Sequence, residues 1–384
     1  MKEIVFPRLL RPQRTSFFLF GPRGCGKSTW LARSYPSART VDLLDEARYQ
    51  SYLAEPGLFF DGLADLQAGS WVAVDEIQRL PQLLNEVHRL IEQRRLKFVL
   101  TGSSARKLRR TGVNLLGGRA LRRLMYPLTP VEMGPAFRLE TALRFGTLPL
   151  VVQAASPADT LSAYVQMYLK EEIQAEALVR NLPGFSRFLP VAALFHGQVL
   201  NLTNVARDAG ITRSTAQGFF EILEDTLMAA RLPALETRLR VREKRHPKFY
   251  WVDPGIVRAA RRNLQVPSAE EQGALLEGFV HMLLCCQRDL YGAIDEISYW
   301  SPAEAKQTEV DFVLNKGGEF VAVEVKAVKR LRPDHLAGLE AIAGLHGLGR
   351  RILVYLGRER LTRSGSVEIL PFAQFVRLLE KREL

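Results

Sequence analysis

An eight-residue segment near the start of the chain restricts the fold more than any other feature. Gly21–Ser28 reads GPRGCGKS, fits the pattern G-x-x-x-x-G-K-[ST], and directly follows the apolar run Ser16–Phe20. Glycines at this spacing let successive backbone N–H groups curl around phosphates, and a helix that begins after the loop adds its dipole. Lys27 is expected to reach the terminal phosphates, and the Ser28 hydroxyl to bind Mg²⁺. The residues expected to bind the nucleotide are Gly21, Pro22, Arg23, Gly24, Cys25, Gly26, Lys27, Ser28 and Thr29.

The segment WVAVDE, residues 71–76, supplies the second half of such a site. Its four apolar residues predict a buried strand, and its two acids follow at the end that lies beside the phosphate loop. Asp75 is placed to hold Mg²⁺ through water, and Glu76 to polarise the attacking water as the general base. The sequence therefore predicts a nucleoside triphosphatase whose cofactors are ATP and Mg²⁺.

Two further segments carry candidate catalytic groups. The apolar run Lys97–Leu100 is followed by Thr101, Ser103 and Ser104, and a hydroxyl there is expected to orient the water or to sense the γ-phosphate, or only to cap the strand end. Arg119 follows two glycines before the next apolar run. An arginine in this position can act as a finger in the site of a neighbouring subunit. The alternative is one more member of a basic patch.

The positive charge of the chain is clustered. Lys and Arg number 53 against 41 Asp and Glu, which gives a formal charge of +12. Residues 102–126 contain seven basic and no acidic side chains, and residues 231–248 contain seven basic and two acidic ones. Such patches are typical of proteins that bind a polyanion, usually nucleic acid. The alternative is a solvated basic face without a partner, and DNA is the partner that we expect.

Composition excludes several other classes. A chain of 384 residues exceeds one ordinary core, so two or three domains are expected. No segment approaches the roughly 18–20 apolar residues of a membrane span. Three cysteines supply neither a disulfide framework nor, with six scattered histidines, a zinc site. The first 20 residues lack the order of a signal peptide and are interpreted as the first strand of a domain, so a cytoplasmic location is expected.

The hydrophobic pattern changes character twice along the chain, which predicts three α/β or helical units. Residues 16–126 alternate short β-branched or aromatic runs with amphipathic stretches, the pattern of a parallel sheet covered by helices. Helical periodicity dominates from about 128 to 230, and alternating strands follow a helix after about 270. The expected domains are 1–135, a P-loop core; 136–265, a helical lid with a winged helix; and 266–384, a separate α/β unit.

The segment 201–217, NLTNVARDAGITRSTAQ, fits a helix-turn-helix. Thr203 and Thr212 are expected N-caps, and Gly210 provides the turn. Exposed polar residues at the start of the second helix would meet a DNA groove, and the basic stretch that follows is similar to a wing. The alternative is a helical bracket between domains that makes no DNA contact.

Acids and a lysine recur in the last third of the chain. Glu277 lies on a predicted helix, Asp311 on a strand, and Glu324 and Lys326 two apart on the next strand, where they share a face. The carboxylates Glu277, Asp311 and Glu324 are expected metal ligands, and Asp311, Glu324 and Lys326 expected catalytic residues that act on a phosphodiester. The alternative is a fold of this kind that has lost catalysis and binds DNA or partners.

Taken together, the chain resembles the prokaryotic AAA-family ATPases that carry a C-terminal domain of unknown function with a PD-(D/E)xK, restriction-endonuclease-like fold. The motifs that carry the resemblance include GPRGCGKST, VAVDEIQRLP, LLGGRALRRLMYPLTPVEM, KFYWVDPGIVRAA and EVDFVLNKGGEFVAVEVKA. The resemblance implies an AAA-type P-loop parallel sheet, a winged-helix middle domain, Arg119 as an inter-subunit arginine, and a homo-oligomer such as a hexameric ring. One departure is Phe145–Pro149, where the family has a second glycine.

Three functions are compatible with these features. The first is an ATPase that remodels or processes DNA, such as branched recombination or repair intermediates, and feeds it to the C-terminal unit. The second keeps the motor and the DNA binding but makes the C-terminal unit an inactive clamp. The third is a nucleotide-dependent switch that binds a protein partner through its middle helices. Binding to DNA that weakens steeply with salt separates the first two functions from the third.

Overall fold

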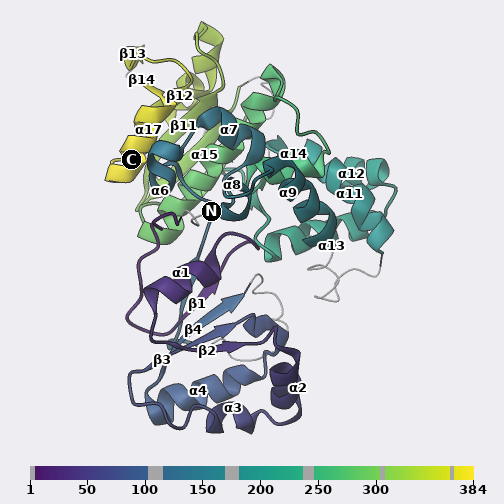
Figure 1. The fold of residues 1–384 in the computed structure, drawn as a ribbon. Coiled ribbons are helices and arrows are strands. Elements are labelled where there is room, and N and C mark those ends of the chain that lie inside the picture. The colour runs from purple at the N-terminus through teal and green to yellow at the C-terminus, as the bar shows by residue number, and fades with distance from the viewer. Residues whose placement is uncertain (1–4, 103–115, 169–180, 237–245, 303–307, 364–366) are drawn as a thin grey trace.

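The computed structural model describes residues 5–102, 116–168, 181–236, 246–302, 308–363 and 367–384. These residues form three sheets, of five, six and three strands. Figure 1 shows the five-stranded sheet at one end of the molecule and the six-stranded sheet at the opposite end. Within the described ranges, no helix combines the length and the apolar character that a membrane crossing requires.

The N-terminal sheet is entirely parallel, with the order β2–β3–β4–β1–β5, which confirms the predicted parallel sheet. Phe17 and Leu19 of β1 join one apolar cluster, while Phe18 and Phe20 join another. Burial on both faces explains why the run is apolar without interruption. The elements are β1 (Phe17–Phe20), α1 (Lys27–Ser34), β2 (Arg39–Asp42), α2 (Glu46–Ala54), α3 (Gly57–Asp61), β3 (Trp71–Asp75), a 3-10 turn (Ile77–Arg79), α4 (Leu83–Arg94), β4 (Lys97–Gly102) and β5 (Leu121–Leu124).

Short helices connect this sheet to the middle of the chain. Between α7 and α8, Gly146 adopts φ 74° and ψ −169°, a backbone that only glycine adopts readily. Thr147 has no positive φ, so the second glycine of the family pattern is not needed there. The helices are α6 (Pro130–Met133), a 3-10 turn (Gly134–Ala136), α7 (Leu139–Phe145), α8 (Pro149–Val152), α9 (Pro157–Ala163), a π-helical segment (Tyr164–Tyr168) and α11 (Leu182–Leu194).

The middle part contains the predicted pair of helices, α12 (Leu202–Ala209) and α13 (Arg213–Asp225). Thr212 caps α13 as expected, but Asn201 rather than Thr203 caps α12, because its side chain accepts from the backbone N–H groups of residues 203 and 204. Gly210 has φ 61° and ends α12. Beside the helices lies an antiparallel sheet with the order β6–β8–β7. Its strands are β6 (Gln198–Val199), β7 (Ala229–Leu232) and β8 (Lys248–Trp251), and α14 (Pro254–Ala260) follows.

The last third is built on a long helix and a mixed sheet. Helix α15 (Ala269–Tyr291) is capped by Ser268 and ends at Gly292. It packs on the sheet, whose order is β13–β14–β12–β11–β10–β9, and also on β5, α7 and β8. The strands are β9 (Glu296–Trp300), β10 (Val310–Lys316), β11 (Glu319–Lys326), β12 (Leu348–Tyr355), β13 (Leu361–Arg363) and β14 (Val367–Pro371), and the helices are α16 (Ala337–Ala341), α17 (Phe372–Lys381) and 3-10 turns at Pro333–Leu336 and Ile342–Gly344.

The middle and C-terminal sheets are joined by backbone hydrogen bonds. Leu235 N–H donates to Tyr299 O at 2.7 Å, and Tyr299 N–H donates to Pro233 O at 3.0 Å. Gly278 of α15 lies so close to His196 that a Cβ at this glycine would be 2.1 Å from the histidine Nε2. The two parts therefore meet at a close-packed boundary.

Candidate functional site

The phosphate loop links β1 to α1 and has the shape of a cradle. Gly24 and Gly26 adopt φ values of 76° and 89°, which turn their N–H groups in a way that residues with a side chain resist. A Cβ at Gly21 would lie 2.4 Å from Met125 O, so this glycine allows the loop to approach the end of β5. The backbone angles and this close approach explain why the motif requires glycine at these positions.

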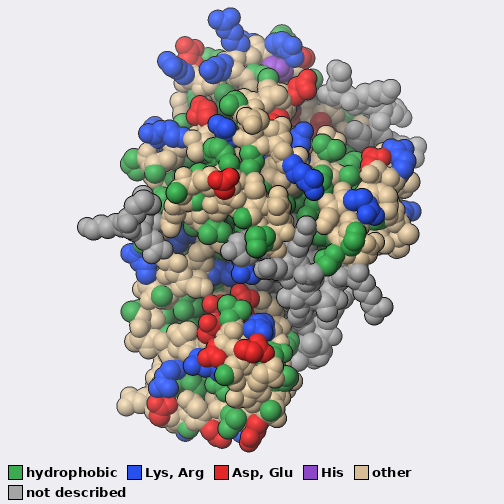
Figure 2. All heavy atoms as spheres, turned by 45° about the vertical axis from the view of Figure 1, so that its right-hand side comes forward, with side chains coloured by type: hydrophobic (Ala, Val, Ile, Leu, Met, Phe, Trp, Pro, Cys, Tyr) green, Lys and Arg blue, Asp and Glu red, His purple; other side chains and the backbone are tan. Residues whose placement is uncertain are grey.

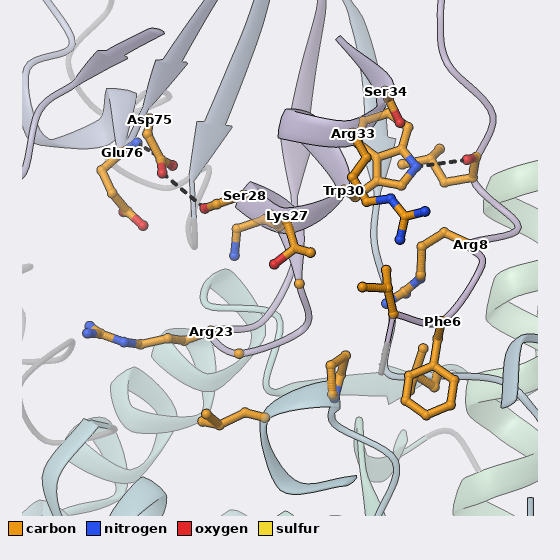
Figure 3. A pocket seen from close by; sticks show the side chains of 18 of the residues that line it. Phe6, Arg8, Arg23, Lys27, Ser28, Trp30, Arg33, Ser34, Asp75 and Glu76 are labelled. Atoms are coloured by element: carbon orange, nitrogen blue, oxygen red, sulfur yellow. Dashed lines mark hydrogen bonds between the residues drawn. The ribbon is translucent and has the colours of Figure 1, made fainter. Parts of the chain in front are cut away.

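Lys27 is the buried cation of this loop. Its side chain lies at the start of α1 with 8% of the residue exposed. Its ammonium donates to Gly21 O at 2.7 Å and to Pro22 O at 3.2 Å. The loop therefore holds the lysine with its own carbonyl groups, beside the N–H groups expected to bind phosphate (Figure 3).

Asp75 brings together three of the residues expected from sequence. Its Oδ2 accepts a hydrogen bond from Ser28 Oγ at 3.1 Å, and its Oδ1 accepts from Glu76 N–H at 3.1 Å and from the Thr101 hydroxyl. The strands β1, β3 and β4 are parallel, so their carboxyl ends reach the same edge of the sheet. One carboxylate thus contacts a hydroxyl from the phosphate loop and a hydroxyl from the neighbouring strand.

Glu76 has an unusual backbone. Its φ of 56° and ψ of 44° lie in the left-handed region, which a non-glycine residue adopts only at some cost. The Gln78 amide donates to a Glu76 carboxylate oxygen, and this holds the acid in place. Backbone strain that is maintained by its surroundings is common at functional sites. Gln78 is a site residue that the sequence did not single out.

These residues line a cavity of about 1150 Å³. Arg8, Trp30, Tyr49 and Gln153 add to its wall, and Figure 3 shows Asp75 and Glu76 on one side of the phosphate loop and Arg8 on the other. The cavity, the cradle and the hydroxyl–carboxylate pair fit a nucleoside triphosphate with its Mg²⁺: Lys27 and the loop N–H groups would hold phosphates, and Ser28 and Asp75 the metal.

Arg8 supports the phosphate loop from outside the motif. It donates to Cys25 O at 2.8 Å and to Tyr126 O at 2.5 Å, and it forms an ion pair with Glu132 at 3.0 Å. The arginine therefore fastens the loop, the end of β5 and α6 to one another. No motif spacing points to it, because its partners are 17 to 124 residues away in sequence.

Arg119 does not line this cavity. It lies on the turn before β5, is exposed, and forms an ion pair with Glu92 of α4 at 2.5 Å. Ser103 and Ser104 lie outside the described residues, as do most of the basic side chains of patch 102–126. The finger role of Arg119 thus stays a prediction about a neighbouring subunit.

In the C-terminal unit, Glu324 and Lys326 share one face of β11, and their side chains form an ion pair at 2.5 Å. Glu324 Oε2 also accepts from Asp311 N–H at 3.2 Å, and Asp311 Oδ2 accepts from Val325 N–H at 2.9 Å. Burial, with the Asp311 carboxylate as a second cause, raises the pKa of Glu324 well above its ordinary value. The predicted pair of strands thus brings these residues together.

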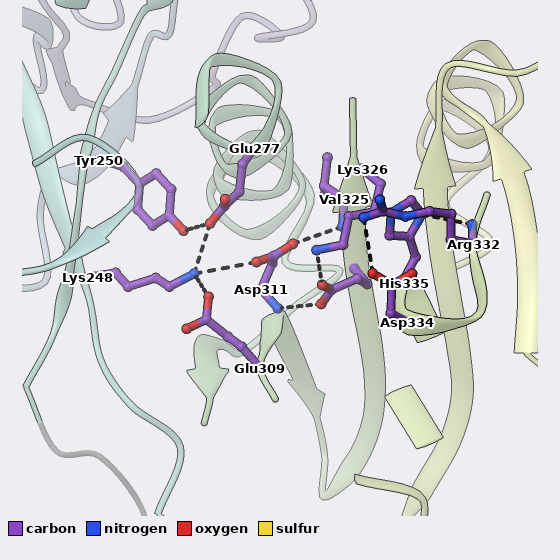
Figure 4. A network of polar contacts seen from close by, with 11 residues as sticks. Lys248, Tyr250, Glu277, Glu309, Asp311, Val325, Lys326, Arg332, Asp334 and His335 are labelled. Carbon is purple, nitrogen blue, oxygen red and sulfur yellow. Dashed lines mark hydrogen bonds and ion pairs between the residues drawn. The ribbon is translucent and has the colours of Figure 1, made fainter. Parts of the chain in front are cut away.

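The predicted metal ligands do not converge as expected. The carboxylates that meet are Glu277, Asp311 and Glu309, whose ligand atoms lie within 4.8 Å of one another, and Glu324 faces Lys326 instead. The ammonium of Lys248 contacts all three acids, at 2.9 Å from Glu277, at 3.4 Å from Asp311, and in an ion pair with Glu309 (Figure 4). A cation already occupies the position that a metal would take, so these residues do not fit a divalent metal.

The ionisation of this cluster follows from its burial. Burial would lower the pKa of Lys248, but the surrounding acids, Glu277 first among them, raise it well above its ordinary value. Burial, assisted by Asp311, raises the pKa of Glu277 to about 7. Tyr250 donates its hydroxyl proton to the same Glu277 carboxylate. Glu309 precedes Asp311 by two residues, and the alternation of an extended chain is the signal by which it could have been found.

Family comparisons match consecutive parts of the chain. An AAA domain matches residues 13–134, a domain of unknown function (DUF8612) matches residues 136–267, and a domain of unknown function (DUF4143) matches residues 272–375. Two proteins described as uncharacterized are similar over most of their length: Rv2008c of Mycobacterium tuberculosis and Mb2031c of Mycobacterium bovis. Each is 26% identical over 377 residues, which cover 93% of this chain and 80% of the relative.

Three solved structures are remotely similar. The replication initiator DnaA bound to AMPPCP and single-stranded DNA is 12% identical, with a TM-score of 0.27 over 56% of this chain and 83% of that one. Can2 from Sulfobacillus thermosulfidooxidans in complex with cyclic tetra-adenylate is 10% identical, with a TM-score of 0.25 over 95% and 98%. VC1899 from Vibrio cholerae is 14% identical, with a TM-score of 0.21 over 96% and 93%. At these TM-scores the likenesses carry no argument.

The family matches confirm two parts of the expected organisation, the AAA-family part and the C-terminal domain of unknown function. The match to the AAA domain covers the parallel sheet, the phosphate loop, Asp75 and Thr101. The chain thus matches an AAA domain at residues 13–134 and the DUF4143 domain of unknown function at residues 272–375.

Proposed function

We propose that this protein hydrolyses ATP with Mg²⁺ and uses the cycle to act on DNA, which its middle part binds and its C-terminal unit holds without cutting. The observation that carries the ATPase part is the Asp75 carboxylate, which contacts both the Ser28 and the Thr101 hydroxyl beside the phosphate cavity. A carboxylate fixed between these two hydroxyls is placed to support metal binding, and the Thr101 hydroxyl is placed to sense the terminal phosphate.

The chain's own residues divide the work of hydrolysis. The Lys27 ammonium would exchange its two carbonyl partners for phosphate oxygens, and the loop N–H groups would bind the remaining oxygens. Glu76 would accept a proton from the attacking water at its carboxylate, while Gln78 keeps that carboxylate oriented. Bound Mg²⁺ would neutralise charge that develops on the transferred phosphoryl group.

The surface of α13 supports contact with DNA. Ala216, Phe219 and Phe220 are buried in the core, while Arg213, Ser214 and Gln217 at the start of the helix are exposed. This is the arrangement in which the first turns of a second helix meet base edges in the major groove. The described members of patch 231–248 do not contribute: Arg231 pairs with Glu224, and Lys248 is buried among acids.

Charge on the described surface does not identify a binding face by itself. Figure 2 shows basic and acidic side chains interspersed on the face displayed. Support for DNA binding therefore rests on the geometry of α13 and on the basic sequence of residues 237–245, which lie outside the described residues. Exposed Arg119, remote from its own cavity, supports an oligomer in which it reaches a neighbouring site.

The test is the ATPase rate of the purified chain with and without duplex, single-stranded and four-way DNA, at several salt concentrations. We expect DNA to stimulate hydrolysis, and log affinity to fall linearly with log salt, with a slope of about −0.9 per phosphate contact on duplex DNA. Arg213→Glu should lower DNA affinity and stimulation while basal ATPase persists. The matched control is Arg39→Glu, which reverses an exposed charge on β2, at the edge of the N-terminal sheet.

Two results would reject parts of the proposal separately. A chain that hydrolyses ATP but shows no salt-dependent affinity for any DNA is the nucleotide-dependent switch, with a protein partner in place of DNA. A chain that binds DNA but does not hydrolyse ATP in its presence contradicts the assignment of Asp75 and Glu76.

A further inference from the structure

Lys248 is a buried lysine with three carboxylate partners that come from another part of the chain. It begins β8 of the middle sheet, and 2% of its side chain is exposed. Glu277 comes from α15, Asp311 from β10, and Glu309 from the residues just before β10. The two family matches end and begin between the lysine and the acids, at residues 267 and 272. The contact therefore joins two units of the chain.

The Lys248 ammonium and the three carboxylates are chemically complementary. An ammonium group has three N–H donors and no acceptor. Each of the three carboxylates supplies an acceptor to Lys248 Nζ (Figure 4). Tyr299 of β9 adds a ring face whose centre lies 5.5 Å from the same nitrogen. The ammonium is thus held on all sides by groups that attract a cation.

The surroundings of the cluster are built to keep this geometry. Tyr250, two residues after Lys248 on β8, donates its hydroxyl to Glu277. The Tyr299 hydroxyl donates to His246 O at 2.5 Å, just before β8. Together with the backbone bonds between Leu235 and Tyr299, these contacts fix the start of β8 on the C-terminal sheet. These contacts keep the backbone of Lys248 beside the three acids that its side chain contacts.

We propose that Lys248 is the resident cation of the Glu277, Glu309 and Asp311 cluster, an internal counterion that locks the middle sheet onto the C-terminal unit and takes the place of a divalent metal ion. This inference goes beyond the proposed ATPase and DNA functions and does not depend on either of them. While the lock is closed, the cluster binds no Mg²⁺ or Mn²⁺, and the C-terminal unit does not cut DNA with these acids.

The first test measures whether the cluster of the intact chain takes a metal. The full chain, free of nucleotide, is titrated with Mn²⁺, and unbound Mn²⁺ is counted by electron paramagnetic resonance. The comparison is Glu309→Gln, which removes one carboxylate and leaves the phosphate loop unchanged. We expect the two isotherms to superimpose. A Mn²⁺ ion that the parental chain binds and Glu309→Gln loses would overturn the proposal, because the acids would then hold a metal in the presence of Lys248.

The second test measures the lock itself. Lys248→Met leaves three acids without their cation, so its unfolding midpoint in urea should fall strongly. Adding Glu309→Gln should recover part of this loss, because it removes one of the repelling charges. The matched control adds Glu296→Gln, which neutralises an exposed acid of β9 outside the cluster.

The comparison of the two double variants holds even where Lys248→Met alone fails to fold. A Lys248→Met/Glu309→Gln chain that is more stable than the Lys248→Met/Glu296→Gln chain supports the lock. Equal stability of the two would overturn it, since Lys248 would then be an ordinary packing residue whose charge has no specific partner.

Discussion

Replacing Gly146 by alanine should weaken the joint between α7, α8 and α14. Gly146 adopts φ 74° and ψ −169°, and such a backbone costs a residue with a side chain about 1–3 kcal/mol. A Cβ there would lie 1.8 Å from Asp253 Oδ1, so the buried carboxylate would have to move. That carboxylate accepts from Thr147 N–H at 2.6 Å, Gly255 N–H at 2.8 Å and Ile256 N–H at 3.2 Å.

The magnitude follows from these two effects. Leaving a buried N–H without an acceptor costs about 1–3 kcal/mol, so with the backbone strain we expect Gly146→Ala to destabilise the chain by about 4 kcal/mol. The matched control is Gly292→Ala. Gly292 also has a positive φ, 60°, but a Cβ there would meet no atom within 4 Å. Its substitution should lower the free energy of unfolding only through the strain of the left-handed backbone, by about 1–2 kcal/mol.

The assay is urea unfolding followed by circular dichroism, with the binding of a non-hydrolysable ATP analogue measured on the folded variants. Helix α8, which begins three residues after Gly146, carries Leu150, whose N–H donates to Gly24 O of the phosphate loop at 3.4 Å, so analogue affinity should fall as well. If Gly146→Ala loses no more stability than Gly292→Ala, the close contact with Asp253 does not constrain this loop, and the argument fails.

Four further variants test the site and the core. Lys27→Ala should weaken nucleotide binding about 10–100-fold, as expected for a lost charged hydrogen bond. Glu76→Gln should bind nucleotide normally and lower kcat at least about 100-fold. Hydrolysis by Glu76→Gln at the parental rate would refute Glu76 as the general base. Arg119→Ala should bind nucleotide but lower kcat about 1000-fold, and mixing it with Lys27→Ala chains should restore activity; co-assembled mixtures that stay inactive would exclude a finger in trans. Burial lowers the pKa of His281 to about 3. The folded chain therefore resists a proton that His281 accepts in the unfolded chain below about pH 6.5, so the free energy of unfolding falls as the pH drops below this value. At pH 5, His281→Phe should avoid about 2 kcal/mol of this fall. Equal pH dependence of unfolding in both chains would contradict this.

The phosphate site could be predicted because its signals are local or follow from strand order. Lys27 sits in a motif whose spacing is set by the loop itself. Asp75 and Thr101 each end an apolar run, and parallel strands place such ends at one edge. Arg8 escaped prediction because it acts through backbone carbonyls, which every residue has, and so leaves no pattern in the sequence.

The C-terminal cluster shows where the sequence misleads. By charge alone Lys248 counts as part of a basic patch facing solvent, yet it is among the most buried side chains of the molecule. Its partners follow 29 to 63 residues later, and no periodicity connects a strand of one unit to acids of the next. Glu309 lies on the same side as Asp311, but the sequence pattern does not single it out, because Glu324 completes the spacing of the motif.

The burial of Lys248 also orders events while the chain is being made. The lysine emerges from the ribosome before Glu277, Glu309 and Asp311 do, and an ammonium buried without a counterion costs several kcal/mol. Until about residue 311 has emerged, the start of β8 therefore stays in water, and the middle sheet waits for its central strand. Asp75, the proposed metal-binding carboxylate of the AAA domain, does not depend on later residues in this way, because its partners Ser28 and Thr101 both precede residue 102. The contacts of Asp75 can thus form during synthesis while the middle sheet is still incomplete. The middle sheet is completed only when the last third of the chain supplies the acids that pair with Lys248.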